Sequence, residues 1–401
     1  MKKLLSIIIL VCCFPGLSAQ YDQHDVVVRN IEVPVRVYDG STFMDKLTIG
    51  DFEVFEGDTP QTIEALYIIR NNQIAKHEGE IDFMPFSSRH YFFLFQMTEY
   101  NPKITEAVDF FMRNVFLPDD TLSVTTPIKN YNLSSEAIQS KPVETIVKDM
   151  QAVIRRDTKV GSTEYNTLLK DLGRIARSLS STGGSGNFGD FESSMGGDIG
   201  NQLARYRQAL QKMEELRVIK EDLFIQFARQ LKRVGGQKNV FFFYQREFRP
   251  EIQAARLQSL MEQYRDQPNI IGTLQDLFLF YHRDISLDTE KLNQAFADAS
   301  INFNLIYLNK DPGHHFGIHM REQSEDVFDV LSQITDATGG IIDSSQNPAA
   351  AIKNTAEKSG TYYLLYYRPK NYIADKTFKN ITVRVKEKEF TVIHRKGYIA
   401  D

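Results

Sequence analysis

The chain has 401 residues and a formal net charge of −5 at pH 7, from 47 basic and 52 acidic residues. This balance argues against nucleic acid or an anionic membrane as the partner, because both are bound through an excess of Lys and Arg. A chain of this length can form two or three domains. Its two cysteines, Cys12 and Cys13, both lie near the N-terminus.

The first residues have the pattern of an export signal. Two lysines are followed by an apolar run at residues 4–13, which is shorter than the ~20 residues that span a bilayer. We expect a signal peptide at residues 1–19, cleavage near Ala19–Gln20, and a periplasmic or secreted product. A lipoprotein signal is the less favoured alternative because Val11, rather than a small residue, precedes the first cysteine. Cleavage would remove both cysteines, which excludes a disulfide or a cysteine nucleophile from the mature chain.

The two ends of the remaining chain have the pattern of β-strands. Apolar residues alternate with polar ones at residues 31–37 and again at residues 381–385, as expected for strands with one buried face. We therefore expect an N-terminal β module at residues 20–86 and further β-strands at residues 359–401.

The middle of the chain, residues 87–358, reads as strands that alternate with helices. This order predicts a parallel sheet with helices on both faces, and so an α/β domain. The predicted buried strands are residues 90–95, 121–125, 239–244 and 302–308, and the predicted helices are residues 104–115, 289–299 and 322–338.

An insertion at residues 178–234 interrupts this alternation. Residues 178–200 are rich in Ser and Gly, which is typical of a loop that buries little surface. From Leu203 to Val234, apolar residues recur at steps of three and four, which predicts one long amphipathic helix. Such a helix packs against its own domain in most proteins, and docking of a partner is the alternative.

Motifs at both ends point to a known family. Residues 51–58 read Asp-Phe-Glu-Val-Phe-Glu-Gly-Asp, and the chain closes on Arg395-Lys396-Gly397-Tyr398 after an aromatic run at residues 362–367. This combination resembles the bacterial secreted von Willebrand factor type A-related domain proteins, from about Ile31 to Ala400. The resemblance implies a Rossmann-like type A domain, and a β-sandwich-like module formed by the N- and C-terminal strands together.

The same resemblance implies a metal-ion-dependent adhesion site that has degenerated. The family has Asp-x-Ser-x-Ser after its first strand, a Thr in a later loop and an Asp after a middle strand. The matching residues here are Gln96, Thr98, Tyr100, Thr163 and Gln245. Both carboxylates are thus replaced by amides, which do not compensate the charge of Mg²⁺. We expect no cofactor, with Mg²⁺ bound through Glu99 or Glu247 as the alternative.

Without a metal, this edge of the sheet becomes a polar surface. Whether these residues bind a partner or only terminate strands is left open by the sequence. The partner-binding candidates are Gln96, Thr98, Glu99, Thr163, Gln245 and Arg246.

Three histidines, His314, His315 and His319, lie within six positions. Three imidazoles could hold zinc, although a solvent-exposed polar loop is the more favoured interpretation. The chain contains no Gly-x-Ser-x-Gly, P-loop or His-Glu-x-x-His motif.

We therefore expect an exported, non-enzymatic protein that binds another protein, with no nucleic-acid partner and no transmembrane segment. One alternative is a metal-binding or hydrolytic protein that uses the histidine loop. Another is a structural subunit of an envelope assembly that uses the long helix.

Overall fold

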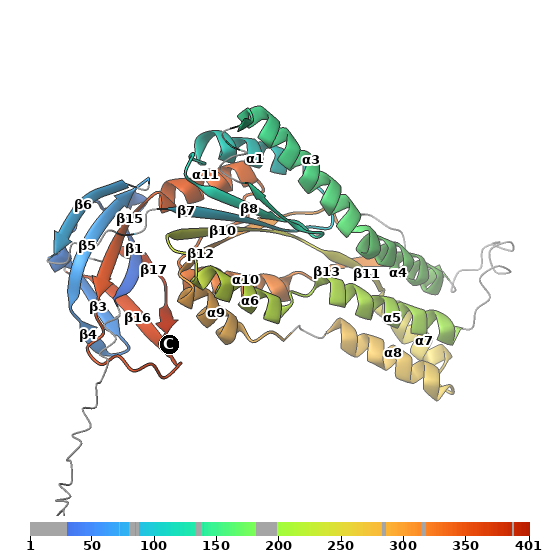
Figure 1. Cartoon of the computed structure of the whole chain (residues 1–401). Helices are drawn as coiled ribbons and strands as arrows, with labels where there is room; N and C mark the ends of the chain where they lie inside the picture. The colour runs from blue at the N-terminus through green and yellow to red at the C-terminus, as the bar shows by residue number, and fades with distance from the viewer. Residues whose placement is uncertain are drawn as a thin grey trace, which may run out of the picture.

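The computed structural model describes residues 30–401 except 72, 80–84, 86–87, 134–137, 139, 182–198, 283–285, 314–317 and 387–388. The chain is a mixed α/β protein in which a central sheet lies between a β module and a lobe of helices (Figure 1). The predicted signal peptide at residues 1–19 and most of the Ser/Gly-rich segment lie outside the described residues.

The central sheet has the strand order β14-β12-β10-β7-β8-β9. All neighbouring pairs are parallel except β8 with β9, which are antiparallel. The four predicted buried strands are confirmed to within a few residues. The strands are β7 (Arg89–Gln96), β8 (Thr121–Thr125), β9 (Asn130–Leu133), β10 (Gln237–Gln245), β12 (Ile301–Leu308) and β14 (Ile342–Asp343).

Helices cover both faces of this sheet (Figure 1). One face carries α1 (Lys103–Asn114), α3 (Val143–Gly161) and α11 (Pro348–Ser359), and the other carries α6 (Glu221–Lys232), α9 (Thr289–Asp298) and α10 (Glu325–Thr338). Successive strand residues face opposite ways. Accordingly, Phe241 packs in one core with Phe111 of α1, while Phe242 packs in the other with Phe296 of α9.

The order of the strands reverses between β7 and β10. The chain leaves β7 through α1 to reach β8 on one side, and later returns to β10 on the other side. Open α/β sheets bind ligands at such a switch point, in the crevice outside the carboxyl ends of the strands. Gln96 and Gln245 end these two strands.

The β module is assembled from both ends of the chain. One sheet has the order β17-β1-β15-β5-β6, with β2 on β1, and the other has the order β18-β16-β3-β4. Their facing side chains form one core, which includes Val35 and Tyr363 from the first sheet and Val54 and Ile381 from the second. The strands are β1 (Ile31–Asp39), β2 (Thr42–Phe43), β3 (Phe52–Glu56), β4 (Thr59–Gln61), β5 (Ile63–Arg70), β6 (Gln73–Gly79), β15 (Thr361–Tyr367), β16 (Phe378–Val385), β17 (Thr391–His394) and β18 (Gly397–Ile399).

A lobe of helices extends from the carboxyl ends of the central strands (Figure 1). It has its own core, in which Tyr206, Leu210 and Leu274 are buried. The lobe contains α4 (Thr163–Ser181), α5 (Ile199–Arg217), α7 (Ala254–Gln263), α8 (Pro268–Tyr281) and the antiparallel ribbon of β11 (Phe248–Ile252) with β13 (Ile318–Glu322).

The prediction of one long helix from Leu203 to Val234 is wrong. The structure has α5 and α6 there, separated by three residues. Met213 is buried in the core of the helical lobe, whereas Ile219 is buried in the core of the central sheet. The apolar residues keep a helical spacing, but those before and after the break pack in different cores. The chain must therefore turn between the two helices.

Among the residues that the structure describes, no helix is long and apolar enough to cross a membrane.

A buried ion pair holds the amino-terminal ends of β7 and β8 together. Arg89 donates two hydrogen bonds to Asp120, with Nε–Oδ1 and Nη2–Oδ2 distances of 2.9 and 2.6 Å. The Asp120 side chain is fully buried. Leu117 N also donates to its Oδ2 atom at 2.7 Å, so the carboxylate fixes the turn before β8.

We expect Asp120→Asn to lower the free energy of unfolding by about 3–5 kcal/mol, because it leaves the Arg89 charge buried without a carboxylate. Urea denaturation would measure this loss. Asp119→Asn is the matched control, since Asp119 is exposed and its change should stay within about 0.5 kcal/mol. Equal effects of the two substitutions would contradict this role of Asp120.

Candidate functional site

Polar side chains converge where β7, β10 and β12 end and the helical lobe begins. We call Gln96, Thr98, Gln245, Glu247 and Lys310 the strand-end cluster. They come from three strand ends that are neighbours in the sheet, and Thr98 and Gln245 are 147 positions apart in the chain. The cluster therefore lies at the switch point.

Gln245 fixes the loop that follows β7. Its Oε1 atom accepts hydrogen bonds from the backbone N–H groups of Thr98 and Glu99, at 3.2 and 2.9 Å. The residue is only 2 % exposed. The prediction that Gln245 binds a partner is therefore corrected, because its amide is buried and holds the loop in place through hydrogen bonds inside the protein.

Lys310 places a cation inside the cluster. Its Nζ atom donates to Thr98 Oγ1 at 2.9 Å and lies 5.5 Å from the centre of the Tyr165 ring. Burial lowers the pKa of Lys310 below its ordinary value, and the negative charges of Glu247 and Glu99 act in the opposite direction. The Lys310 ammonium group thus contacts the hydroxyl group of Thr98, which the resemblance implies to be a metal ligand.

The residues of the cluster do not fit a divalent cation. Gln96 directs its Nε2 atom to the carbonyl oxygen of Arg217 at 3.2 Å, and the Gln245 oxygen is already engaged. The Lys310 ammonium adds a like charge next to Thr98, which would repel Mg²⁺. Within the described part of the chain, no group of three His, Cys, Asp or Glu side chains is arranged to hold a metal ion.

Glu247 is not available as a replacement ligand at the surface. It is 2 % exposed, and its Oε2 atom has no hydrogen-bond partner. Burial raises the pKa of this carboxyl group, while the Tyr165 hydroxyl, Lys310 and Arg217 lower it. Glu99, by contrast, is exposed.

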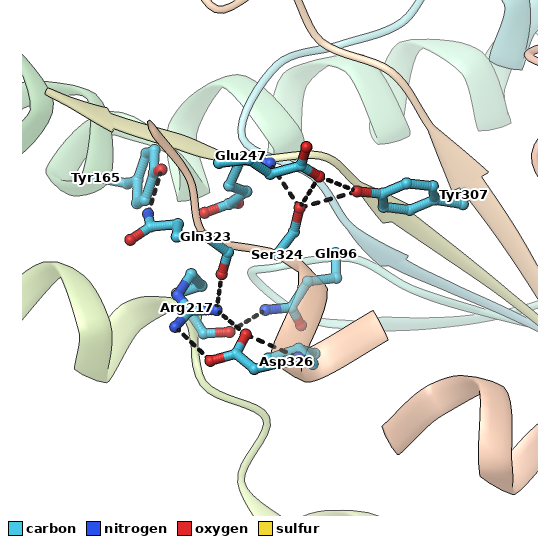
Figure 2. Close-up of polar contacts among 10 residues, drawn as sticks. Gln96, Tyr165, Arg217, Glu247, Tyr307, Gln323, Ser324 and Asp326 are labelled. Atoms are coloured by element: carbon cyan, nitrogen blue, oxygen red, sulfur yellow. Dashed lines mark hydrogen bonds and ion pairs between the residues drawn. The ribbon is translucent and has the colours of Figure 1, made fainter. Parts of the chain in front are cut away.

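A hydrogen-bonded network joins the sheet to the helical lobe (Figure 2). Arg217, at the end of α5, donates to the Gln323 carbonyl oxygen and to both Asp326 oxygens, at 2.8 and 3.2 Å. Gln323 Nε2 donates in turn to the Tyr165 hydroxyl of α4 at 3.3 Å. Two helices of the lobe are therefore attached to the segment that enters α10.

Arg246 is held in the second part of this network. Its Nε atom lies 3.0 Å from a Glu322 oxygen. The Tyr307 hydroxyl donates to the same oxygen at 2.6 Å and lies 2.9 Å from Ser324 Oγ. Arg246 is only partly exposed, so its charge is largely committed within the chain.

The resemblance implied that Thr163 lies in a loop next to the cluster, but the structure does not place it there. It is the first residue of α4, is exposed, and donates its hydroxyl to Lys159 O at 3.1 Å. The contact with the cluster is made one turn later, where Asn166 Nδ2 lies 3.4 Å from Thr98 O. The sequence did not indicate Asn166, because its position depends on how α3 continues into α4.

The histidine hypothesis is tested for one residue only. His319 is an exposed residue of strand β13, paired with Glu251 of β11, so it does not belong to a loop. His314 and His315 lie outside the described residues.

Comparison with protein-family models, with curated proteins and with solved structures finds no match to this chain. The geometry of the strand-end cluster and its surroundings is therefore what indicates a function for this chain.

We expect Glu247→Gln to stabilise the protein more at pH 8 than at pH 5. An acid whose pKa is raised by folding favours the folded state at low pH, and that contribution is lost as the pH rises through the folded pKa. The amide removes a buried charge at pH 8, and the expected gain there is about 1 kcal/mol. Urea denaturation at the two pH values measures it, with the exposed Glu99→Gln as the control that should show no such difference.

Calorimetric titration would test whether Lys310 stands in the place of a metal. We expect no saturable binding of Mg²⁺ or Mn²⁺ by the purified chain, because the carboxylates are missing and a cation is already present. A variant with Gln96→Asp, Gln245→Asp and Lys310→Met should gain Mn²⁺ binding. Tight Mn²⁺ binding by the unmodified chain would contradict this assignment, and binding of Zn²⁺ alone would favour the histidine segment.

Proposed function

We propose that this chain is an exported, non-enzymatic protein that recognises another protein without a divalent metal. In this proposal, recognition uses the strand-end edge of a Rossmann-like von Willebrand factor type A domain, and residues 1–19 direct export. The motifs near both ends of the chain support the choice of family. The parallel sheet and its switch point support the choice of edge.

One observation carries the proposal: Lys310 Nζ contacts Thr98 Oγ1 at 2.9 Å, at the carboxyl end of β7. The resemblance implies a divalent cation at this edge. Here the chain supplies a cation of its own, and Gln245 holds the adjoining loop in place without a metal. Recognition at this edge would then be insensitive to chelators.

The helical lobe is the alternative contact surface. Phe278 and Leu279 of α8 are 52 % and 67 % exposed, and two adjacent large apolar side chains in water are typical of contact sites. This surface would suit the alternative in which the chain is a structural subunit of an envelope assembly. A substitution at Leu279 can therefore distinguish binding through the helical lobe from binding through the strand-end edge.

The test is affinity capture from the envelope fraction of the producing organism, with the mature chain immobilised in the presence of EDTA. We expect a defined protein to be retained by the unmodified chain and lost with Lys310→Glu, because the substitution reverses the charge at the edge. Asp119→Lys, at the opposite edge of the sheet, and Leu279→Ser, on α8, should retain it. If the captured protein is lost with Leu279→Ser but not with Lys310→Glu, the helical lobe and not the strand-end edge binds the partner. If capture requires added Mg²⁺, recognition is not independent of metal.

A further inference from the structure

A groove lies beside the strand-end cluster, between the loop that follows β7 and helix α3. Its volume is about 780 Å³, and Thr98, Tyr100, Ala152 and Asn166 are among the residues that line it. Thr98 is shared with the cluster, so the groove begins where Lys310 makes its contact.

The groove is basic although the whole chain is acidic. Lys148, Arg155 and Lys159 line it from α3, and Glu99 is the only carboxylate on its wall within the described residues. The spacing of seven and four residues places the three cations on one side of the helix. This local charge contrasts with the net charge of −5 for the whole chain.

Among the described residues, these three cations differ from their neighbours in forming no ion pair with a carboxylate. Near the same helix, Arg113 pairs with Glu144 at 2.9 Å, Lys141 with Asp149 at 3.2 Å, and Arg156 with Asp157 at 2.9 Å. In the described part of the chain, no carboxylate lies within ion-pair distance of the three groove cations. Their charges therefore remain available to an external anion.

The groove also has an apolar part. Tyr100 and Pro102 lie on one side and Ala152 on the other. The Arg155 guanidinium lies 5.9 Å from the centre of the Tyr100 ring, so the positive charge is held next to an apolar surface. An occupant that combines carboxylates with an apolar side chain would satisfy both parts.

We infer that this groove binds an acidic segment of the partner protein. This inference rests on the proposed function. From Lys148 to Lys159, α3 advances by about 16 Å at ~1.5 Å per residue. An extended peptide covers that length with roughly five residues at ~3.3 Å each. Its carboxylates would contact the three cations, and an apolar side chain would pack on Tyr100.

A polypeptide fits this groove better than a nucleic acid does. Three phosphate contacts give only weak binding at physiological salt, whereas DNA-binding sites commonly use six or more. With a nucleic acid bound, the apolar wall would lie against a charged phosphate backbone. Tyr100 is the one aromatic residue among the described residues that line the groove. Nucleic acid is therefore an outcome of the test rather than the expected ligand.

The experiment measures fluorescence anisotropy of labelled eight-residue peptides with the mature chain. One peptide contains Asp and Glu around a single Leu, and its counterpart contains Asn and Gln. We expect the acidic peptide to bind and the neutral one not to bind, with weaker binding at 300 mM than at 50 mM NaCl. Arg155→Glu combined with Lys159→Glu should weaken binding at least about tenfold.

The control variant makes the same change of charge on the helical lobe, with Lys212→Glu and Arg265→Glu, two exposed residues. It should bind the acidic peptide as the unmodified chain does. An equal loss of peptide binding in both variants would show that the effect comes from net charge, and would overturn the inference. Preference for an oligothymidine of similar length would also overturn it.

The outcomes separate this inference from the proposed function. If Lys310→Glu abolishes capture of the partner while Arg155→Glu with Lys159→Glu leaves both capture and peptide binding unchanged, the edge is the recognition site and the groove is not. If capture is unaffected by either variant, the proposed function itself fails.

Discussion

The parallel pairing of β7 with β10 sets the positions of the helical layers, the strand-end cluster and the groove. Both strands are buried on their two faces, and their register runs from Arg89 with Gln237 to Gln96 with Tyr244. Such a sheet needs a helical layer on each side. In β7 and β10 the polar side chains lie toward the strand ends, and the reversal of strand order places the carboxyl ends of these two strands side by side.

At that point a cation and a buried carboxylate of the chain lie close to neutral amides. Gln96 and Gln245 place neutral amides at these strand ends, and Lys310 supplies a positive charge beside Thr98. The buried Glu247 balances part of that charge, although burial raises its pKa. Hydrogen bonds from Thr98 and Glu99 to Gln245, and from Lys310 to Thr98, hold the side chains of this site in place.

The helical lobe determines which side of the cluster remains open. Arg217 and Tyr165 attach α5 and α4 to the segment that leads into α10, and so cover one flank of the strand ends (Figure 2). The other flank, between the loop after β7 and α3, is the groove lined by Lys148, Arg155 and Lys159. Arg217, from the segment that interrupts the alternation of strands and helices in the sequence, thus helps to cover one flank of the strand ends.

Elements whose apolar residues all pack in one core could be predicted from the pattern of residues alone. The strand at residues 239–244 and the helix at residues 289–299 were predictable, because each carries a single periodic pattern. The break between α5 and α6 was not, because residues of identical spacing enter two cores. Only the tertiary structure could bring Lys310 to Thr98, 212 positions away, since a contact between strand ends depends on the order of strands in the sheet and leaves no local pattern in either segment.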